Sequence, residues 1–214
     1  MEIKELLKIG LEESGLLPSN EQIDAFMTYL SELKKWNKAY NLTGLEKDED
    51  IVIKHFLDSL LYLRAMPPGE PRIADAGSGA GFPGIPIKIM RPQTAIYLIE
   101  PSQKKTAFLR HVIRRLAMEK IEVIESRVEQ IKVNQELPLP VDIAVTRALF
   151  SIGEFIKKAA HIVKRGGSLV LNKGPKVKEE LKNLRGVHYD LQTVTLPLTG
   201  ITRYLVIVRL NGEV

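Results

Sequence analysis

A glycine-rich stretch carries the clearest chemical signature in this chain. Asp75 precedes glycines at positions 77, 79 and 81, so the pattern D-x-G-x-G-x-G runs from 75 to 81. Residues 72–74 before it are typical of a strand and residues 85–90 after it of a helix. Glycine permits positive φ and a close approach to a ligand, and the following helix presents unpaired N–H groups above the turn. We therefore predict a ligand site at this turn.

The loop does not match the dinucleotide fingerprint G-x-G-x-x-G, because Phe82 stands at its third glycine position when counted from Gly77. A diphosphate needs a helix N-terminus aimed at its negative charge. A cationic nucleoside without phosphates, such as S-adenosylmethionine, instead needs a nearby carboxylate and backbone contacts. Asp75 beside Gly77 and Gly79 favours the second ligand. A glycine-rich turn that binds nothing is the alternative, and the loop alone does not decide between them.

A second carboxylate strengthens the nucleoside interpretation. Residues 94–99 form a β-branched and aromatic run typical of a buried parallel strand, and Glu100 follows it directly. In nucleotide-binding βαβ units an acid about 20 residues beyond the glycines accepts hydrogen bonds from ribose hydroxyls. We predict that role for Glu100; the alternative is an ordinary surface glutamate.

Composition excludes several classes of function. The 214 residues include no cysteine, which removes disulfides, thiolate metal sites and cysteine nucleophiles, and we expect no metal site. No apolar run approaches the roughly 18 residues of a membrane span, and the first residues lack a signal-peptide pattern. We therefore expect a cytoplasmic protein with no membrane partner. The net charge of +5 is a mild preference for polyanions.

The chain divides into two predicted parts, a helical segment over 1–68 and an α/β domain over 69–214, with a Pro-Pro-Gly junction at 67–69. Ser19 and Gln22 form a predicted capping box, and Ser151 and Glu154 form another later in the chain. A helix is predicted to follow this first capping box, and residues 36–44 are predicted to end it. The acids at 48–50 are predicted to begin the next helix. One apolar face is predicted for the first of these helices, made by Ile23, Phe26, Met27, Leu30 and Leu33.

The second part alternates strands and helices. Further strands are predicted at 121–125, 141–146 and 168–172. A helix over 102–118 has a basic outer face, which either meets RNA phosphates or is simply solvated. The last two β-rich segments, 187–196 and 203–210, have no helix between them and should pair antiparallel. A mostly parallel sheet that ends in such a hairpin is unlike a dinucleotide dehydrogenase and like a methyltransferase.

Further polar residues follow the predicted strands. Arg147 ends the fourth strand and Lys173 the fifth, and ligands of open α/β sheets lie beyond the strands' carboxyl ends. Both cations are therefore expected beside the same crevice, although a structural ion pair is the alternative for Arg147. Val128 and Glu129 follow the third strand, where they could flank an adenine.

Together these residues resemble the bacterial small-subunit ribosomal RNA methyltransferase G family, also called glucose-inhibited division protein B, over nearly the whole chain. The glycine loop is shared by many methyltransferases, but the ordered set is specific. The matching pieces are Trp36-Asn37-Lys38, Asn41-Leu42-Thr43, His55-Phe56-Leu57-Asp58-Ser59-Leu60, the glycine loop through Gly84-Ile85-Pro86, Ser126-Arg127-Val128-Glu129, Thr146-Arg147-Ala148 and Lys173-Gly174.

The resemblance implies a Rossmann-like class I methyltransferase fold with a seven-stranded sheet, behind an N-terminal helical segment. It also implies methyl transfer from S-adenosylmethionine to N7 of one guanine in 16S ribosomal RNA. Ala80 and Phe82 stand where relatives often have Pro and Leu, and Glu100 where many have Asp. The residues that would line the donor site are Gly77, Phe82, Val128, Glu129 and Arg147.

The residues that are missing agree with this reaction. Methylation at pyrimidine C5 needs a thiolate, and enzymes acting on exocyclic amines usually carry an Asn- or Asp-Pro-Pro-aromatic element where this chain has residues 146–149. Guanine N7 presents an in-plane lone pair without a proton, so catalysis can depend on positioning and needs no strong general base. We predict that Arg147 and Lys173 position the substrate through phosphate or guanine O6.

Three other residues are candidates for RNA contact: Asn41, Thr43 and His55. Turn or capping roles for the first two and a packing role for His55 are equally open. We expect 16S ribosomal RNA or a small-subunit particle as the partner, and a monomeric protein. Two rival functions remain. Methyl incorporation that ignores RNA would indicate a small-molecule methyltransferase, and RNA binding without donor binding would indicate a non-catalytic RNA-binding module.

Overall fold

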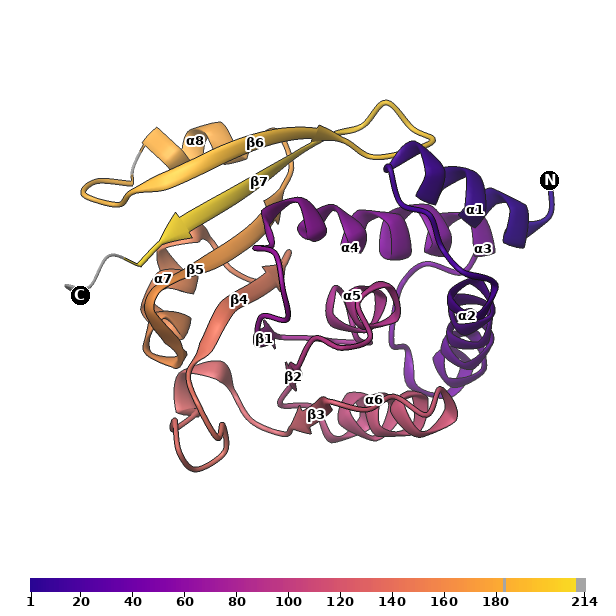
Figure 1. Cartoon of the computed structure of the whole chain (residues 1–214), viewed down its shortest axis with the longest axis horizontal. Coiled ribbons are helices and arrows are strands. Elements are labelled where there is room, and N and C mark those ends of the chain that lie inside the picture. The colour runs from indigo at the N-terminus through magenta and orange to yellow at the C-terminus, as the bar shows by residue number, and fades with distance from the viewer. Residues whose placement is uncertain (183, 211–214) are drawn as a thin grey trace.

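The computed structural model describes residues 1–182 and 184–210. One seven-stranded sheet runs through it in the order β3-β2-β1-β4-β5-β7-β6, with helices on both faces (Figure 1). The strands are β1 (Ile73–Ala76), β2 (Ile96–Ile99), β3 (Ile121–Ile124), β4 (Val141–Arg147), β5 (Val163–Lys173), β6 (Tyr189–Thr195) and β7 (Thr202–Arg209).

The longer described helices are α1 (Ile3–Glu13), α2 (Asn20–Tyr40), α5 (Gly84–Met90), α6 (Gln103–Arg115), α7 (Ile152–Ala159) and α8 (Val177–Lys182). A continuous helical run covers α3 (Asp48–Ile51), the π-helix η1 (Val52–Leu57), α4 (Asp58–Leu60) and the 3₁₀ turn η2 (Leu61–Ala65). Two more 3₁₀ turns are η3 (Val128–Gln130) and η4 (Ala160–Ile162).

Strand directions follow the predicted pattern. The strands β3, β2, β1, β4 and β5 pair in parallel, whereas β7 pairs antiparallel with both β5 and β6. The predicted Rossmann-like sheet with a final antiparallel hairpin is therefore confirmed. Chain order reverses between β1 and β4, and this switch point is where open α/β sheets form a ligand crevice.

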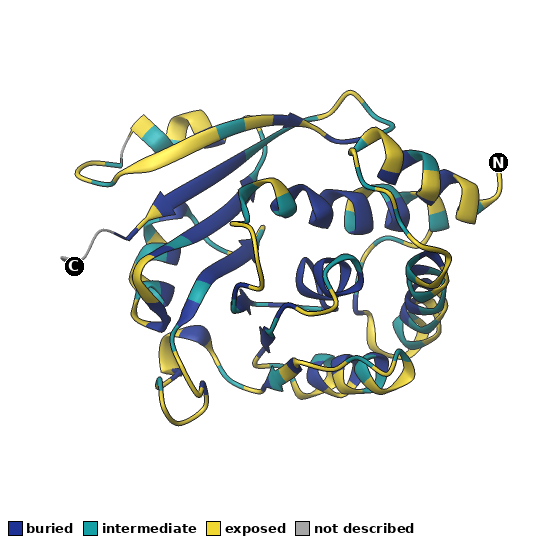
Figure 2. Ribbon diagram, viewed as in Figure 1, coloured by how far each residue is buried: buried dark blue, intermediate teal, exposed yellow. Residues whose placement is uncertain are grey.

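Each face of the sheet has its own hydrophobic core. Side chains alternate along a strand, so Ile73 joins the core shared with α1, α2, α5 and α6, while Ala74 joins the core shared with α7. Figure 1 shows α4, α5 and α6 against one face, with α1 and α2 farther from the sheet. The central strands and the inner sides of these helices are largely buried, whereas the edge strand β6 is mostly exposed (Figure 2).

Hydrogen bonds tie the N-terminal helical run to the sheet. The Tyr62 hydroxyl donates to the carbonyl of Thr146 on β4 and accepts from the backbone N–H of Asn172 on β5, at 3.1 Å for the second bond. Arg203 on β7 donates its Nε–H to Asp58 Oδ1 at 2.8 Å. The helical segment therefore shares a core and buried polar contacts with the α/β part, and the predicted boundary at 67–69 stays a prediction.

Several local predictions can be compared with these elements. The capping boxes at Ser19–Gln22 and Ser151–Glu154 are both present. The predicted break over 36–44 is wrong in its first half, because α2 continues to Tyr40 and ends at Asn41, which has φ of 50°. Packing of Trp36 against Phe108, with ring centroids 5.7 Å apart, accounts for the extra turn.

The fifth strand also begins earlier than its predicted start at 168. Val163 already pairs with Val141, and the ladder resumes at Ser168 after a register shift. Gly166 has φ of 74° within this irregular part. At Gly167 a Cβ would lie 2.6 Å from the Asp142 carbonyl oxygen. The two glycines therefore allow the strand to pass through a bulge before residue 168.

Candidate active site

The glycine loop joins β1 to α5 at the carboxyl edge of the sheet. Gly77 and Gly79 have φ of 74° and 59°, a region that side chains other than glycine's rarely adopt. The backbone N–H groups of Gly77 and Ser78 both donate to the Ile99 carbonyl, at 2.8 and 3.1 Å, which ties the loop to the end of β2. A Cβ at Gly77 would lie 2.2 Å from Leu149 Cδ2. Leu149 is exposed and its side chain can move, so the positive φ is what favours glycine and bare backbone where the loop faces the crevice.

Asp75 lies beneath this loop, with none of its surface exposed. Its Oδ2 accepts a hydrogen bond from the N–H of Gly84, the first residue of α5, at 2.9 Å. Its Oδ1 is buried without a hydrogen-bond partner among the described residues. Burial raises the pKa of the Asp75 carboxyl to about 7, although the Gly84 N–H opposes that shift. Asp75 thus holds the loop, and direct contact with a donor stays a prediction for it.

Glu100 lies where the sequence predicts it, directly after β2. Its Oε2 accepts from the N–H of Gly79 at 2.9 Å, and its Oε1 accepts from the N–H of Ser102 at 3.0 Å. The residue is 5% exposed. Each carboxylate oxygen can accept two hydrogen bonds, so both retain acceptor capacity. The carboxylate is therefore fixed beside the loop in a form that suits ribose hydroxyls.

A second group of side chains meets the loop at Phe82. The Arg147 guanidinium lies over the Phe82 ring, 5.0 Å from its centroid. Its Nη2 donates to His55 Nδ1 at 2.9 Å and its Nη1 donates to the Lys54 carbonyl at 3.1 Å. The His55 ring also stacks on Phe82, with centroids 4.4 Å apart. No carboxylate forms an ion pair with Arg147 among residues 1–182 and 184–210, so it retains N–H groups for a ligand.

Other predicted site residues are engaged within the protein. Lys173 Nζ donates to the Phe150 carbonyl at 2.6 Å and to Glu180 Oε1 at 3.1 Å. Glu129 forms an ion pair with Lys158 at 2.7 Å, and the bond from Lys158 lowers the pKa of Glu129. Val128 is buried and Asn41 is exposed. Ligand contacts of these four residues stay predictions.

Two residues of the site escaped the sequence reasoning. The Tyr29 hydroxyl donates to the Ala80 carbonyl inside the loop, and its ring packs 5.4 Å from that of Phe82. Tyr29 falls on the apolar face of α2, three residues after Phe26, and that spacing was the available signal for its burial. Leu149 covers Gly77, and the positive φ of Ala148, 57°, that places it has no sequence signature.

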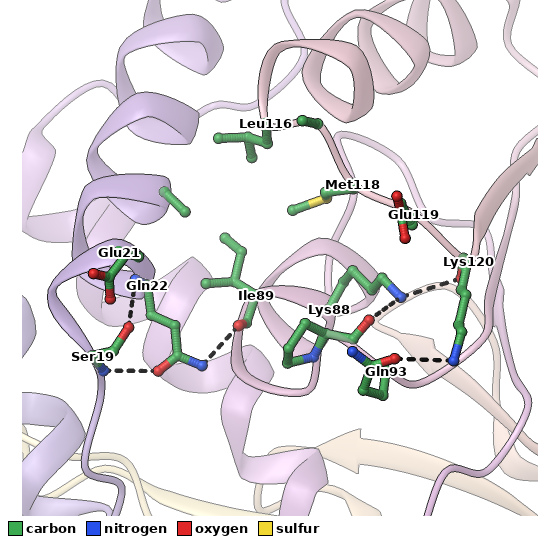
Figure 3. A pocket seen from close by; sticks show the side chains of 13 residues that line it. Ser19, Glu21, Gln22, Lys88, Ile89, Gln93, Leu116, Met118, Glu119 and Lys120 are labelled. Atoms are coloured by element: carbon green, nitrogen blue, oxygen red, sulfur yellow. Dashed lines mark hydrogen bonds between the residues drawn. The ribbon is translucent and has the colours of Figure 1, made fainter.

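A separate hollow of about 510 Å³ lies between α2, α5 and α6 (Figure 3). Buried Lys88 donates there to the carbonyls of Pro92, Thr94 and Lys120, at 2.7, 2.6 and 3.3 Å. Thr94 and Lys120 precede β2 and β3, so this hollow faces the amino ends of those strands. The ligand crevice of a parallel sheet lies at the opposite edge, and the hollow is therefore not the nucleoside site.

Known proteins similar to this chain identify its family. The sequence profile described as GidB, rRNA small subunit methyltransferase G, matches residues 22–202. The protein named ribosomal RNA small subunit methyltransferase G from Acetivibrio thermocellus is 34% identical over 98% of this chain and 89% of its own length. Its namesake from Pelotomaculum thermopropionicum is 36% identical over 99% and 92%. The chain belongs to the rRNA small subunit methyltransferase G family.

A solved structure supports the fold. A SAM dependent methyltransferase from Aquifex aeolicus superposes with a TM-score of 0.54 at 19% identity, covering 85% of this chain and 98% of that one. The predicted family and the predicted class I methyltransferase fold are thus confirmed. The profile match includes the glycine loop, Arg147 and the N-terminal residues Thr43 and His55. Among the described residues, no helix combines the length and apolar character needed to cross a membrane.

Proposed function

We propose that this protein transfers a methyl group from S-adenosylmethionine to N7 of a guanine in 16S ribosomal RNA. Family membership supports the reaction class. The observation that carries the donor site is the glycine loop at the β1–β4 switch point, with its backbone at positive φ and Glu100 fixed beside it. Small-subunit ribosomal RNA is the substrate named for the relatives, and the net charge of +5 is compatible with a polyanion.

S-adenosylmethionine is the methyl donor, and the residues present fit it. The bare backbone of Gly77 and Gly79 suits its amino-acid end, and the remaining acceptor capacity of Glu100 suits its ribose hydroxyls. The Asp75 carboxyl lies beneath the loop and holds the first N–H of α5, and its raised pKa leaves the charge beside the donor mainly to Glu100. When bound, the donor supplies an electrophilic methyl group on a sulfonium centre.

The side chains of the crevice suit positioning more than proton transfer. Guanine N7 carries no proton at neutral pH, so the reaction needs no general base. Burial, reinforced by the nearby Arg147, lowers the pKa of His55 to about 3, so its imidazole is neutral at working pH. Arg147 offers N–H groups that its contacts with His55 and Lys54 leave free. Arg147 therefore orients a reactant at the crevice.

We further propose that the substrate is 16S RNA alone or within a small-subunit particle, and that the protein acts as a monomer in the cytoplasm. The basic residues of α6 are partly committed, since Arg110 pairs with Glu125 and Arg115 with Glu32, at 3.2 and 3.8 Å. RNA contact is accordingly expected nearer the crevice, where Asn41 is exposed and Arg147 has unused donors.

Donor binding tests the site. Gly77→Val should weaken S-adenosylmethionine binding in titration calorimetry at least about 100-fold, because a β-branched side chain requires a strained φ there and replaces bare backbone at the donor site. Gly174→Ala is the matched control, since its Cβ meets nothing within 4 Å. Unchanged affinity of Gly77→Val would contradict the site. Tritiated-methyl incorporation that ignores RNA would instead favour a small-molecule methyltransferase, and RNA binding without donor binding a non-catalytic module.

A further inference from the structure

The contact between Arg147 and His55 fixes the protonation of the histidine. A guanidinium only donates hydrogen bonds, so His55 Nδ1, 2.9 Å from Arg147 Nη2, must be an unprotonated acceptor. The single imidazole proton is then on Nε2, which lies 2.7 Å from Thr43 Oγ1. Nε2–H therefore donates to the threonine hydroxyl, and the neutral ring connects a residue of the N-terminal segment to the end of β4.

The threonine is itself held in place. Its backbone N–H donates to Asn37 Oδ1 on α2 at 2.8 Å, and its Oγ1 accepts from the Leu45 N–H at 3.2 Å. The turn after α2 thus fixes the hydroxyl that receives the His55 proton. The sequence of contacts runs from Asn37 through Thr43 and His55 to Arg147, and it joins residues 110 positions apart in the chain.

Phe82 helps to orient the Arg147 guanidinium. Its ring is stacked against His55 and lies under the Arg147 guanidinium. The Lys54 carbonyl accepts from Nη1 and His55 from Nη2, so two acceptors and one aromatic face define the plane of the guanidinium. Its other N–H groups have no hydrogen-bond acceptor among residues 1–182 and 184–210, and they are the groups available to a reactant.

We propose that His55 is a positioning residue that aims Arg147 at the reactants, and that Thr43 holds His55 in the tautomer this requires. The proposal rests on the proposed function only in assigning Arg147 to the reactants. It differs from the expectation that Thr43 and His55 contact RNA, because their hydrogen-bonding atoms already face each other and Arg147. Asn41, which is exposed, is left as the RNA candidate of that set.

The electrostatic surroundings agree with a neutral imidazole. Arg147 is the charged side chain that faces the ring, and with burial it lowers the pKa of His55 to about 3. Lys54, the preceding residue, turns its ammonium to Asp50 at 2.6 Å and offers only its carbonyl to the site. The contact therefore persists across the pH range in which the protein works.

A double-mutant cycle tests the positioning role. His55→Phe keeps a ring on Phe82 but removes both hydrogen bonds. It should lower kcat/KM for methyl transfer to small-subunit RNA by about 10- to 100-fold, the usual effect of displacing a supporting group. The loss should appear in the same kinetic parameter, kcat or KM, that Arg147→Ala changes. In the Arg147→Ala background the same change should cost less than about 2-fold. Full additivity of the two losses would overturn the proposal.

Two further variants separate positioning from packing. His55→Asn retains an acceptor at the place of Nδ1 and should recover part of the lost activity, whereas equal loss in both variants would contradict the proposal. His111→Phe is the matched control, because His111, like His55, makes a side-chain hydrogen bond and contacts an aromatic ring, but outside the crevice. Its partners are Glu32 at 2.7 Å and the Trp36 ring at 5.1 Å. It should leave kcat/KM unchanged.

Nitrogen-15 NMR of the histidine side chains tests the contact without any assay of activity. His55 should show an unprotonated Nδ1 and a protonated Nε2 down to pH 5. In Arg147→Ala its pKa should move upward, because a neighbouring positive charge has been removed. A protonated Nδ1 in the wild-type protein would overturn the proposal. Wild-type protein that lacks methyl transfer but shows the expected tautomer would count against the proposed function alone.

Discussion

The helical run from Asp48 to Ala65 contributes to two polar clusters that differ in burial. We call Thr43, His55 and Arg147 the crevice cluster, in which all three residues are half-buried. We call Asp58, Tyr62, Asn172 and Arg203 the buried cluster, in which Asp58, Tyr62 and Asn172 are 6%, 1% and 6% exposed. His55, Asp58 and Tyr62 come from this one run, and their side chains contact residues of β4, β5 and β7.

The two clusters attach the same helical run to two different groups at the end of β4. Tyr62 holds the carbonyl of Thr146, while His55 holds the side chain of Arg147, the next residue of β4. Thr146 also donates its hydroxyl to the Ala76 carbonyl at 2.9 Å, where the glycine loop begins. The buried contacts therefore fix the position of the carboxyl end of β4 relative to the glycine loop. The crevice cluster fixes the orientation of the Arg147 side chain. Mutations in the two clusters should have separable effects.

The largest effect on stability is expected from Arg203→Met. This change leaves the Asp58 carboxylate buried without its cation, which costs about 3–5 kcal/mol of unfolding free energy. Urea denaturation measures it. Arg209→Met is the control, since its ion pair with Asp190 is exposed, with both side chains more than half accessible, and should cost under about 1 kcal/mol. Equal losses of unfolding free energy in the two variants would contradict the special role of burial in the buried cluster.

A pH dependence of stability is expected below the glycine loop. The pKa of Asp75 is raised from 3.8 to about 7 in the folded protein, so the folded state binds the proton more tightly than the unfolded chain. Stability should therefore fall as pH rises from about 4 to 7, on the order of 3 kcal/mol relative to Asp75→Asn. Denaturation at pH 5 and pH 8 measures this difference. A pH-independent difference between the two proteins would contradict it.

Tyr62→Phe removes the hydroxyl that joins the helix to β4 and β5. The unfolding free energy should drop by about 1–2 kcal/mol, because a buried carbonyl and a buried N–H lose their partner. Since Thr146 precedes Arg147, kcat/KM measured on fully folded protein should also fall, by a few-fold. A loss of stability with unchanged kcat/KM would contradict the link between the position of the carboxyl end of β4 and catalysis.

Glu100→Gln is expected to have the smallest effect. An amide can keep one acceptor but turns its NH₂ toward Gly79 or Ser102 N–H, and it loses charge beside the loop. The dissociation constant for S-adenosylmethionine should rise about 10-fold, in line with one charge-assisted hydrogen bond. Glu122→Gln serves as the control in the same calorimetric titration, because Glu122 is an exposed residue of β3. A greater effect on folding than on donor affinity would contradict the assignment.

The features that could be predicted from the sequence are those that depend on residues close together in the chain. The glycine loop, the parallel strands, the final hairpin and both capping boxes are patterns of neighbouring residues, and the structure contains them. The turn after α2 was placed too early because propensity does not register the packing of Trp36 on Phe108, 72 residues away. The pairing of His55 with Arg147 spans 92 residues, and no spacing rule could have supplied it.

The central claim is that this crevice delivers a methyl group to guanine N7. The direct measurement is to incubate the protein with S-adenosylmethionine and unmodified 16S RNA or small-subunit particles, then digest the RNA and identify the methylated nucleoside by mass spectrometry. We expect one 7-methylguanosine per 16S molecule with the wild-type protein and none with Gly77→Val. Methyl groups on any other atom, or none in either substrate, would contradict it.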